Sequence, residues 1–177
     1  MNHIKLKKVS LKSHPQYNER WLHDVIGMDP SILGIGDVVV KDRERVHVGA
    51  GRLDLLLQDA DGHGRYEVEI QLGPTDESHI IRTIEYWDIE RRRYPQYDHT
   101  AVIVAEDITS RFLNVIGLFN GFIPIMALQV SAIETPDGVG LHFTKVLDTV
   151  RLGLLDEDEE TAELTNRNYW ESVRGTD

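Results

Sequence analysis

Acidic and amide side chains interrupt an otherwise apolar stretch at residues 52–73, RLDLLLQDADGHGRYEVEIQLG. Asp54 lies in its first half, and Glu67, Glu69 and Gln71 lie in its second half. Carboxylate and amide oxygens are hard ligands of the kind that Mg²⁺ prefers. Charged groups among so many leucine and valine side chains make this stretch the first candidate for chemistry.

The stretch is predicted to be a β-hairpin whose register brings two carboxylates together. Asp61-Gly62 is a two-residue turn signal, and apolar strands at 52–58 and 65–71 flank it. A turn centred on these residues pairs Arg52 with Gln71, Asp54 with Glu69 and Leu56 with Glu67. Facing residues have Cβ atoms about 5 Å apart, so Asp54 and Glu69 are expected side by side.

Strand alternation predicts one polar face and one apolar face for this hairpin. The polar face comprises Arg52, Asp54, Leu56, Glu67, Glu69 and Gln71, and the apolar face comprises Leu53, Leu55, Leu57, Tyr66, Val68 and Ile70. Glu67 is expected to be a solvated acid paired with an arginine, and an acid that supports the site from behind is the alternative. Gly49 and Gly51 are expected to permit a turn or a close backbone approach before the first strand.

Two facing carboxylates repel each other, so the predicted pair needs a compensating interaction. A divalent cation is the simplest candidate, since Mg²⁺ is typically held by one or two carboxylates and water. A raised carboxylate pKa, or a salt bridge to Arg52 or another arginine, would also offset the repulsion. A further alternative is that the acids lie on the solvated face of an edge hairpin and do no chemistry.

The elements around the hairpin predict an α/β domain with a central mixed β-sheet flanked by helices. Periodicity predicts helices over 16–28, capped by Asn18, and over 75–93, capped by Thr75 or Asp76. A hairpin or bent strand is expected at 36–48, strands at 100–105, 122–133 and 140–146, and a helix over 109–120. The inward positions are predicted to be Ile80, Ile81, Ile84 and Trp87 on the long helix and Phe112, Val115, Ile116 and Phe119 on the last one.

Composition excludes several classes of site. The chain has 177 residues and no cysteine, which excludes disulfides, thiolate zinc sites and cysteine nucleophiles and suits a reducing cytoplasm. No apolar run approaches the ~20 residues of a membrane span. The net charge of −11 argues against broad, non-specific binding to nucleic acid but leaves room for a local basic patch.

The order of elements and the spacing of the polar residues resemble the PD-(D/E)xK nuclease superfamily, the restriction-endonuclease-like and RecB-like phosphodiesterases. As in that superfamily, Asp54 is followed by Glu69-Ile70-Gln71 at the end of the next strand and then by a helix. The resemblance covers residues 16–133. The stretches WLHDVIGMDPSILGIGD and GAGRLDLLL look like the nuclease domains of mismatch- and branch-cleaving members. The resemblance implies a core of αβββαβ order with an extra helix and strands.

The resemblance implies a metal-dependent deoxyribonuclease site. Asp54 and Glu69 would be ligands of a catalytic Mg²⁺ or Mn²⁺, and the main-chain carbonyl of Ile70 would complete the metal shell. Glu19 matches an extra acid that many members bring to the metal, and a solvent-facing helix residue is the alternative. Gln71 stands where the superfamily usually has lysine, so it would position the attacking water without supplying positive charge.

The resemblance also makes DNA the expected partner. Arg82 and His79, on the helix after the hairpin, and Arg52 are candidates for contacts with nucleic acid; surface charge without a ligand is the alternative for the helix residues. A homodimer or a separate DNA-binding partner is predicted, with no membrane association.

Three functions are open at this point: a working nuclease, a catalytically inactive nuclease fold that serves as a binding or assembly module, and an acidic protein-interaction domain without metal. The predicted organisation is a leader or edge strand over 1–15, a nuclease-like domain over 16–147, and a polar, partly helical tail over 148–177.

Overall fold

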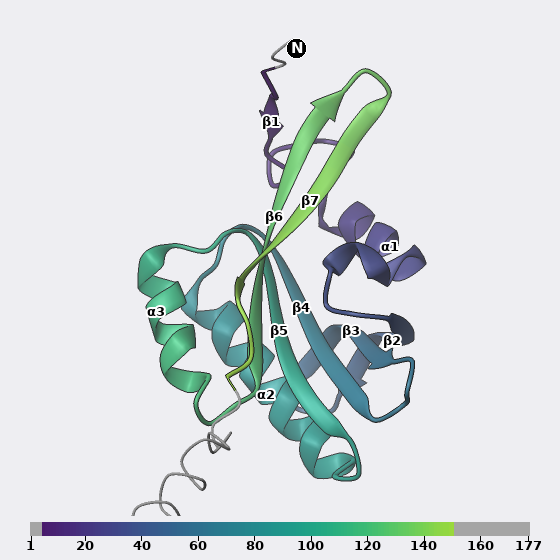
Figure 1. The fold of residues 1–177 in the computed structure, drawn as a ribbon, viewed down its shortest axis with the longest axis vertical. Coiled ribbons are helices and arrows are strands. Elements are labelled where there is room, and N and C mark those ends of the chain that lie inside the picture. Colours follow the sequence, from purple (N-terminus) through teal and green to yellow (C-terminus); the bar gives the residue numbers. More distant parts are fainter. Residues whose placement is uncertain (1–4, 151–177) are drawn as a thin grey trace, which may run out of the picture.

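The computed structural model describes residues 5–150, and within them seven strands form one mixed sheet (Figure 1). The strands are β1 (Lys8–Val9), β2 (Val38–His47), β3 (Gly51–Asp59), β4 (Gly64–Pro74), β5 (Asp98–Asp107), β6 (Ile125–Thr135) and β7 (Gly138–Leu147). Their order is β1-β6-β5-β4-β3-β2, and β7 also pairs with β6. The pairs β4/β5 and β5/β6 are parallel, and the other pairs are antiparallel.

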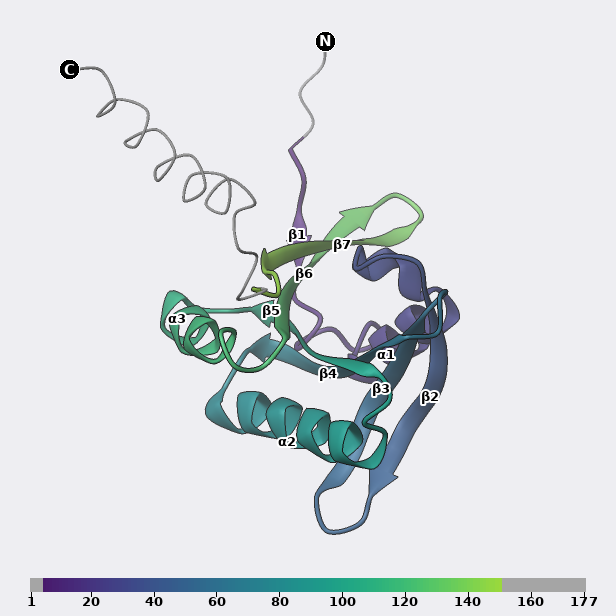
Figure 2. The same cartoon turned by 60° about the horizontal axis from the view of Figure 1, so that its bottom comes forward.

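The helices are α1 (Glu19–Met28), a short 3₁₀ helix (Pro30–Leu33), α2 (Glu77–Arg93) and α3 (Ser110–Phe119). Figure 2 shows α1 on one face of the sheet and α2 on the other. Leu22 and Ile26 of α1 join one apolar cluster, whereas Ile80 and Trp87 of α2 join a second cluster with Ile116 of α3. The predicted α/β class, a mixed sheet flanked by helices, is therefore confirmed. The predicted tail beyond residue 150 lies outside the described residues.

None of the helices within residues 5–150 combines the length and the apolar character needed to cross a membrane.

The ends of α1 follow from local chemistry. The Asn18 side chain accepts a hydrogen bond from the Trp21 amide at 3.1 Å, which satisfies one of the unpaired amides of the first turn. Asp29-Pro30 follows the last residue, and the residue before proline avoids the helical region. The predicted cap is confirmed, and the helix it starts presents Glu19 and His23 on adjacent turns.

The cap of α2 is Asp76 and not Thr75, because the Asp76 carboxylate accepts from the His79 amide at 2.9 Å. The predicted apolar stripe of this helix is wrong in one position, since Ile81 is 63% exposed. The buried face instead carries several polar residues, His79, Thr83, Tyr86 and Glu90, beside Ile80 and Trp87. Helical periodicity of apolar residues missed this face because polar side chains with buried partners occupy it.

The predicted register of the central hairpin is confirmed near the turn, whereas the predicted pairs Asp54–Glu69 and Arg52–Gln71 lie beyond the end of the ladder. The Cα pairs are Leu55–Val68, Leu56–Glu67, Leu57–Tyr66 and Gln58–Arg65. Residues 36–48 do not form a hairpin of their own; they supply one long strand, β2, whose pairing with β3 shifts between Val40 and Asp42. That shift is the signature of a bulge, which bends a strand.

Two predictions about which side chains point into the core were wrong. Leu53 packs with Leu56 and Tyr86 beneath α2, whereas Leu55 joins the α1-side core, so simple alternation does not hold between Leu53 and Leu55. On α3, only Ile116 is buried; Val115 and Phe119 are 37% and 39% exposed, and Phe112 packs at the core's margin.

The end of β4 is tied to the N-terminal segment by one buried carboxylate. Glu106, near the end of β5, accepts hydrogen bonds from the amides of Leu11 at 2.6 Å, Lys12 at 3.0 Å and Gly73 at 2.7 Å. Three amide donors satisfy a carboxylate that would otherwise be costly to bury. This clamp positions the strand end just beyond Gln71.

Candidate functional site

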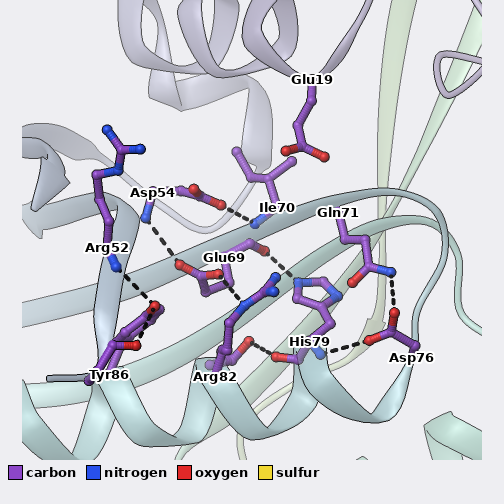
Figure 3. Close-up of polar contacts among 12 residues, drawn as sticks. Glu19, Arg52, Asp54, Glu69, Ile70, Gln71, Asp76, His79, Arg82 and Tyr86 are labelled. Carbon is purple, nitrogen blue, oxygen red and sulfur yellow. Dashed lines mark hydrogen bonds and ion pairs between the residues drawn. The ribbon is translucent and has the colours of Figure 1, made fainter. Parts of the chain in front are cut away.

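At the open end of the central hairpin, the side chains of Asp54 and Glu69 each bond to the main chain of the other strand (Figure 3). The Glu69 Oε1 atom accepts a hydrogen bond from the Asp54 amide at 3.1 Å. In return, the Asp54 Oδ2 atom accepts from the Ile70 amide at 2.8 Å. These bonds lie just beyond the last ladder pair, Leu55–Val68, so side chains replace the backbone ladder where the strands part. Both acids are held rigidly by main-chain donors.

The two carboxylates are reached from opposite faces of the sheet, so the prediction that they share one face does not hold; alternation breaks between Leu53 and Leu55. His23 on α1 lies beside Asp54, with its Nε2 atom 3.6 Å from Oδ2. Arg82 on α2 lies beside Glu69, with its Nε atom 3.5 Å from Oε2. Both distances exceed the 2.7–2.9 Å of a strong charge-assisted hydrogen bond, so neither side chain forms such a bond with its acid.

Burial and mutual repulsion make the acids reluctant to ionise together. Burial raises the pKa of Asp54, and His23 and the Ile70 amide oppose that rise. Burial, followed by the charge of Asp54, raises the pKa of Glu69 to about 8. Glu69 is only 2% exposed. Close positive charge would favour the charged form of both groups.

Of the alternatives to a metal, the solvated edge is not what the structure shows, and the ion pair with an arginine is made by Arg82 at 3.5 Å and not by Arg52. Arg52 does not neutralise the acids, since its guanidinium pairs with Glu44 at 3.1 Å on the surface. The acids do not lie on a solvated edge either, because β4 is flanked by β3 and β5 and Glu69 is buried. A raised pKa is present, and it marks a site that a cation would suit.

The expectation that Glu67 is a solvated partner of an arginine is wrong. Glu67 is fully buried, and its Oε1 atom lies 2.7 Å from Nδ1 of His99. Further along the same face, Glu90 pairs with Arg45 at 2.9 Å and lies 3.5 Å from His47. A buried network of acids, histidines and one arginine thus continues beneath α2, away from the Asp54–Glu69 pair.

Gln71 is not directed at the acid pair. Its amide nitrogen donates to the Pro74 carbonyl at 3.1 Å and to the Asp76 carboxylate at 3.0 Å. Figure 3 shows the side chain turned towards the start of α2 and away from Asp54. The structure therefore uses this amide to connect the end of β4 to the helix cap.

Glu19 lies at the α1 side of the site. Its carboxylate accepts from the Leu72 amide at a long 3.4 Å, and its charge contributes to the raised pKa of Asp54. Glu19 is therefore close enough to Asp54 for electrostatic interaction. The Ile70 amide belongs to the site through its bond to Asp54.

His79 is a buried support for the strand and not a surface contact. It is 0% exposed, and its Nε2 atom lies 3.2 Å from the carbonyl oxygen of Glu69. Burial lowers the pKa of His79 to about 4, so the ring is neutral and can donate to that carbonyl. The prediction that His79 contacts nucleic acid is wrong. Arg82, one turn further along α2, is 46% exposed and does reach solvent beside Glu69.

Two residues of the site escaped sequence reasoning, His23 and Tyr86. His23 follows Glu19 by four residues, so the spacing on α1 could have signalled it. The Tyr86 hydroxyl accepts from the Arg52 amide at 3.0 Å and donates to the Ala50 carbonyl at 3.3 Å. No local pattern could have paired Tyr86 with a strand 34 residues earlier.

The donor set suits a hard cation that keeps much of its water. Among residues 5–150, no three histidine, aspartate or glutamate side chains come together as a ready metal cage. Asp54 and Glu69 offer two carboxylates, and main-chain carbonyls and water would have to supply the rest. Mg²⁺ is commonly bound in this way, whereas structural zinc requires more protein ligands.

Comparisons with known proteins bear on the fold. No protein-family model matches the chain, and no curated protein matches it significantly. A repair endonuclease from Pyrococcus abyssi superposes with a TM-score of 0.50 at 19% identity, over 57% of this chain and 43% of that one. SfsA from Pyrococcus furiosus, solved with Ca²⁺, superposes with a TM-score of 0.43 at 13% identity, over 71% of this chain and 63% of that one.

The chain thus spans less than two thirds of the length of either structure. At these identities the similarity shows the fold alone, and it is the repair endonuclease that supports it. The curled mixed sheet with its flanking helices is a nuclease-like core.

Proposed function

We propose that this chain is a divalent-metal-dependent nuclease of the PD-(D/E)xK type that hydrolyses phosphodiester bonds in DNA. The observation that carries the proposal is the Asp54–Glu69 pair, in which a half-buried and a buried acid each accept a main-chain hydrogen bond and have no basic side chain nearer than 3.5 Å. A nuclease-like core around this pair adds support. A chain without cysteine suits the reducing cytoplasm in which we place this activity.

Asp54 and Glu69 would hold the metal, with the Ile70 carbonyl as the proposed third protein ligand. A bound divalent cation lowers the pKa of a coordinated water and offsets charge on the phosphate. His79 fixes the main chain at Glu69, and Tyr86 fixes the main chain next to Arg52, so both position the acids. Arg82 is placed to meet negative charge arriving beside Glu69.

The reaction would add water across a P–O bond. The water oxygen bonds to phosphorus, the bond to the leaving oxygen breaks, and a proton reaches that oxygen. Glu19, near Asp54 on α1, is the acid that would help hold the attacking water or a second ion.

One observation favours a second candidate, a nuclease fold that binds DNA without cutting it. The Gln71 amide is bonded to Pro74 and Asp76, and no lysine stands at that position. A positive charge that would stabilise the phosphorane is therefore missing from this position.

Cleavage assays with Mg²⁺ and with Mn²⁺, on plasmid, linear duplex and single-stranded DNA, test the proposal. We expect metal-dependent cleavage that falls about 100-fold or more in Asp54→Asn and in Glu69→Gln, because each loses a charged ligand. Asp61→Asn, at the exposed tip of the same hairpin, is the matched control and should cut normally.

Calorimetric titration with Mg²⁺ separates the two candidates. Metal binding that both site variants lose, without cleavage of any substrate, would establish the inactive fold. Absence of both cleavage and metal binding would overturn the metal site altogether.

A further inference from the structure

A polar hollow opens beside Asp54 on the α1 side of the sheet. Its volume is about 490 Å³, which falls within the range of small-ligand sites and suits one nucleotide better than a duplex. The lining residues come from α1, β2 and β3. They are Arg20, His23, Asp24, Arg43, Glu44, Arg52, Asp54 and Leu55.

The guanidinium group of Arg43 fits against a glycine, Gly27, of the facing helix α1. This group occupies the space that a Cβ atom at Gly27 would need. Glycine inside a helix costs about 1 kcal/mol relative to alanine, and Gly27 is the buried ninth residue of α1. Arg43 is otherwise held weakly, since its only ion pair with a described residue, to Asp24, spans 3.9 Å. Glycine at this position makes room for the charged end of Arg43.

Arg20 and His23 bring further unsatisfied donors to the hollow. The Arg20 side chain makes no hydrogen bond or ion pair with any other residue between 5 and 150, and it is exposed. His23 Nε2 is buried and has no hydrogen-bond partner among the described residues. This nitrogen lies 3.6 Å from the Asp54 carboxylate, and both residues line the hollow.

The charges in the hollow leave two arginines for a ligand. Arg52 is already paired with Glu44 at 3.1 Å. Arg20 and Arg43 remain, against Asp24 and Asp54. A cation on Asp54 would leave the hollow net positive, in a chain whose overall charge is −11. Guanidinium groups bind phosphate through two parallel hydrogen bonds, so an anionic phosphate matches this arrangement.

We propose that this hollow seats one backbone phosphate of a DNA strand, held by Arg20 and Arg43 beside His23 and Asp54. The inference rests on the proposed function, because the same strand carries its scissile phosphate to Asp54 and Glu69. In this arrangement the DNA strand approaches from the α1 face of the sheet, and α1 and β2 position the substrate. Arg20, Arg43 and His23 are positioning residues in this arrangement.

Fluorescence anisotropy of a labelled single-stranded oligonucleotide, in Ca²⁺ and in EDTA, tests the assignment. Arg20→Gln and Arg43→Gln should each raise Kd about 10-fold and reduce the slope of log K against log salt by about 1. Gly27→Ala keeps every charge but displaces the Arg43 guanidinium, so it should weaken binding about as much as Arg43→Gln while the chain stays folded. Binding of the wild-type chain should be tighter in Ca²⁺ than in EDTA.

Arg92→Gln, at the far end of α2 where the side chain is 75% exposed, is the matched control and should bind normally. Equal losses in Arg92→Gln and Arg20→Gln would overturn the proposal, since they would indicate diffuse electrostatic attraction. Unchanged binding in Arg20→Gln and Arg43→Gln would also overturn it. Competition by a nucleoside monophosphate as effective as by the oligonucleotide would show that the hollow takes a free nucleotide and would contradict a strand phosphate.

The experiments distinguish failure of the phosphate site from failure of the proposed nuclease activity. Arginine-dependent binding without cleavage would support the phosphate site in the hollow and refute the nuclease activity. Cleavage that is lost in Asp54→Asn but normal in the double variant Arg20→Gln/Arg43→Gln would support the nuclease activity and refute the phosphate site in the hollow.

Discussion

At the scale of single residues, the polar groups around the hairpin divide into those that reach the acid pair and those that do not. Arg82, His23 and the Ile70 amide reach it, and each favours ionisation of Asp54 or Glu69. Gln71 is held 3.0 Å from Asp76, at the cap of α2. The chemistry of the site therefore depends on the acids and on what binds them, with Gln71 acting on the helix start.

Gln71→Ala tests that division. We expect metal-dependent cleavage to stay within about tenfold of the wild type and stability to fall by about 1 kcal/mol, the cost of a lost hydrogen bond. Gel-based cleavage kinetics and urea unfolding measure the two quantities. A loss of activity as large as that of Glu69→Gln would show instead that the amide leaves Asp76 during the reaction.

At the scale of elements, α2 fastens the beginning of β3. The Tyr86 hydroxyl bonds to the main chain at Ala50 and Arg52, and Gly51 lies between them with φ +123°. A Cβ atom at Gly51 would lie 2.5 Å from that hydroxyl. The expected close approach before the first strand is confirmed here, and it ties the strand of Asp54 to the helix of Arg82.

Gly51→Ala should lower the free energy of unfolding by about 2–3 kcal/mol. About 1–2 kcal/mol comes from backbone strain, and about 1 kcal/mol comes from the displaced hydroxyl bonds. Gly49→Ala is the matched control, because Gly49 also has a positive φ, +88°, but has no atom near its Cβ position. Equal losses of stability in the two variants, measured by urea unfolding, would exclude a role for the Tyr86 contact.

At the scale of the whole molecule, buried titratable groups make stability depend on pH. Burial lowers the pKa of His47 and lowers that of His79 to about 4. Burial raises the pKa of Glu67. Burial and the charge of Asp54 raise that of Glu69 to about 8. The histidines favour the folded chain at higher pH and the acids favour it at lower pH, so their contributions oppose each other.

His79 provides the cleanest prediction. Between pH 6.5 and 4 the unfolded chain binds a proton at this histidine and the folded chain does not, so its contribution to stability is lost as pH falls through that range. The loss is at most about 3 kcal/mol. Urea unfolding in metal-free buffer should show a smaller loss on acidification for His79→Gln than for the wild type. His63→Gln, at the exposed hairpin turn, should follow the wild type. An unchanged pH profile in His79→Gln would contradict a buried neutral ring.

Association with other molecules is a property of the whole molecule. The expected homodimer or DNA-binding partner remains a prediction, as do the division at residues 15 and 147 and the metal itself. The N-terminal segment within the described range contributes β1, which pairs with β6 at Ile133 and Ala132.

The amino-acid sequence by itself determined what short-range physics controls. The Asp61-Gly62 turn set the hairpin register, Asn18 capped α1, and the apolar periodicity specified an α/β class. Each of these depends on neighbours in the chain, and so could be predicted without a structure. The acid pair was predicted in this way because the register near the turn brings Asp54 and Glu69 close, although side-chain bonds and not the ladder join them.

Only the tertiary structure decided which partners the polar side chains have. Whether Glu67 meets water or His99, which lies 32 residues further along the chain, depends on how α2 and β5 pack around it. The same packing buried His79, which local patterns placed on the surface. Such outcomes are decided by contacts between elements far apart in the chain, whose burial free energy outweighs local periodicity.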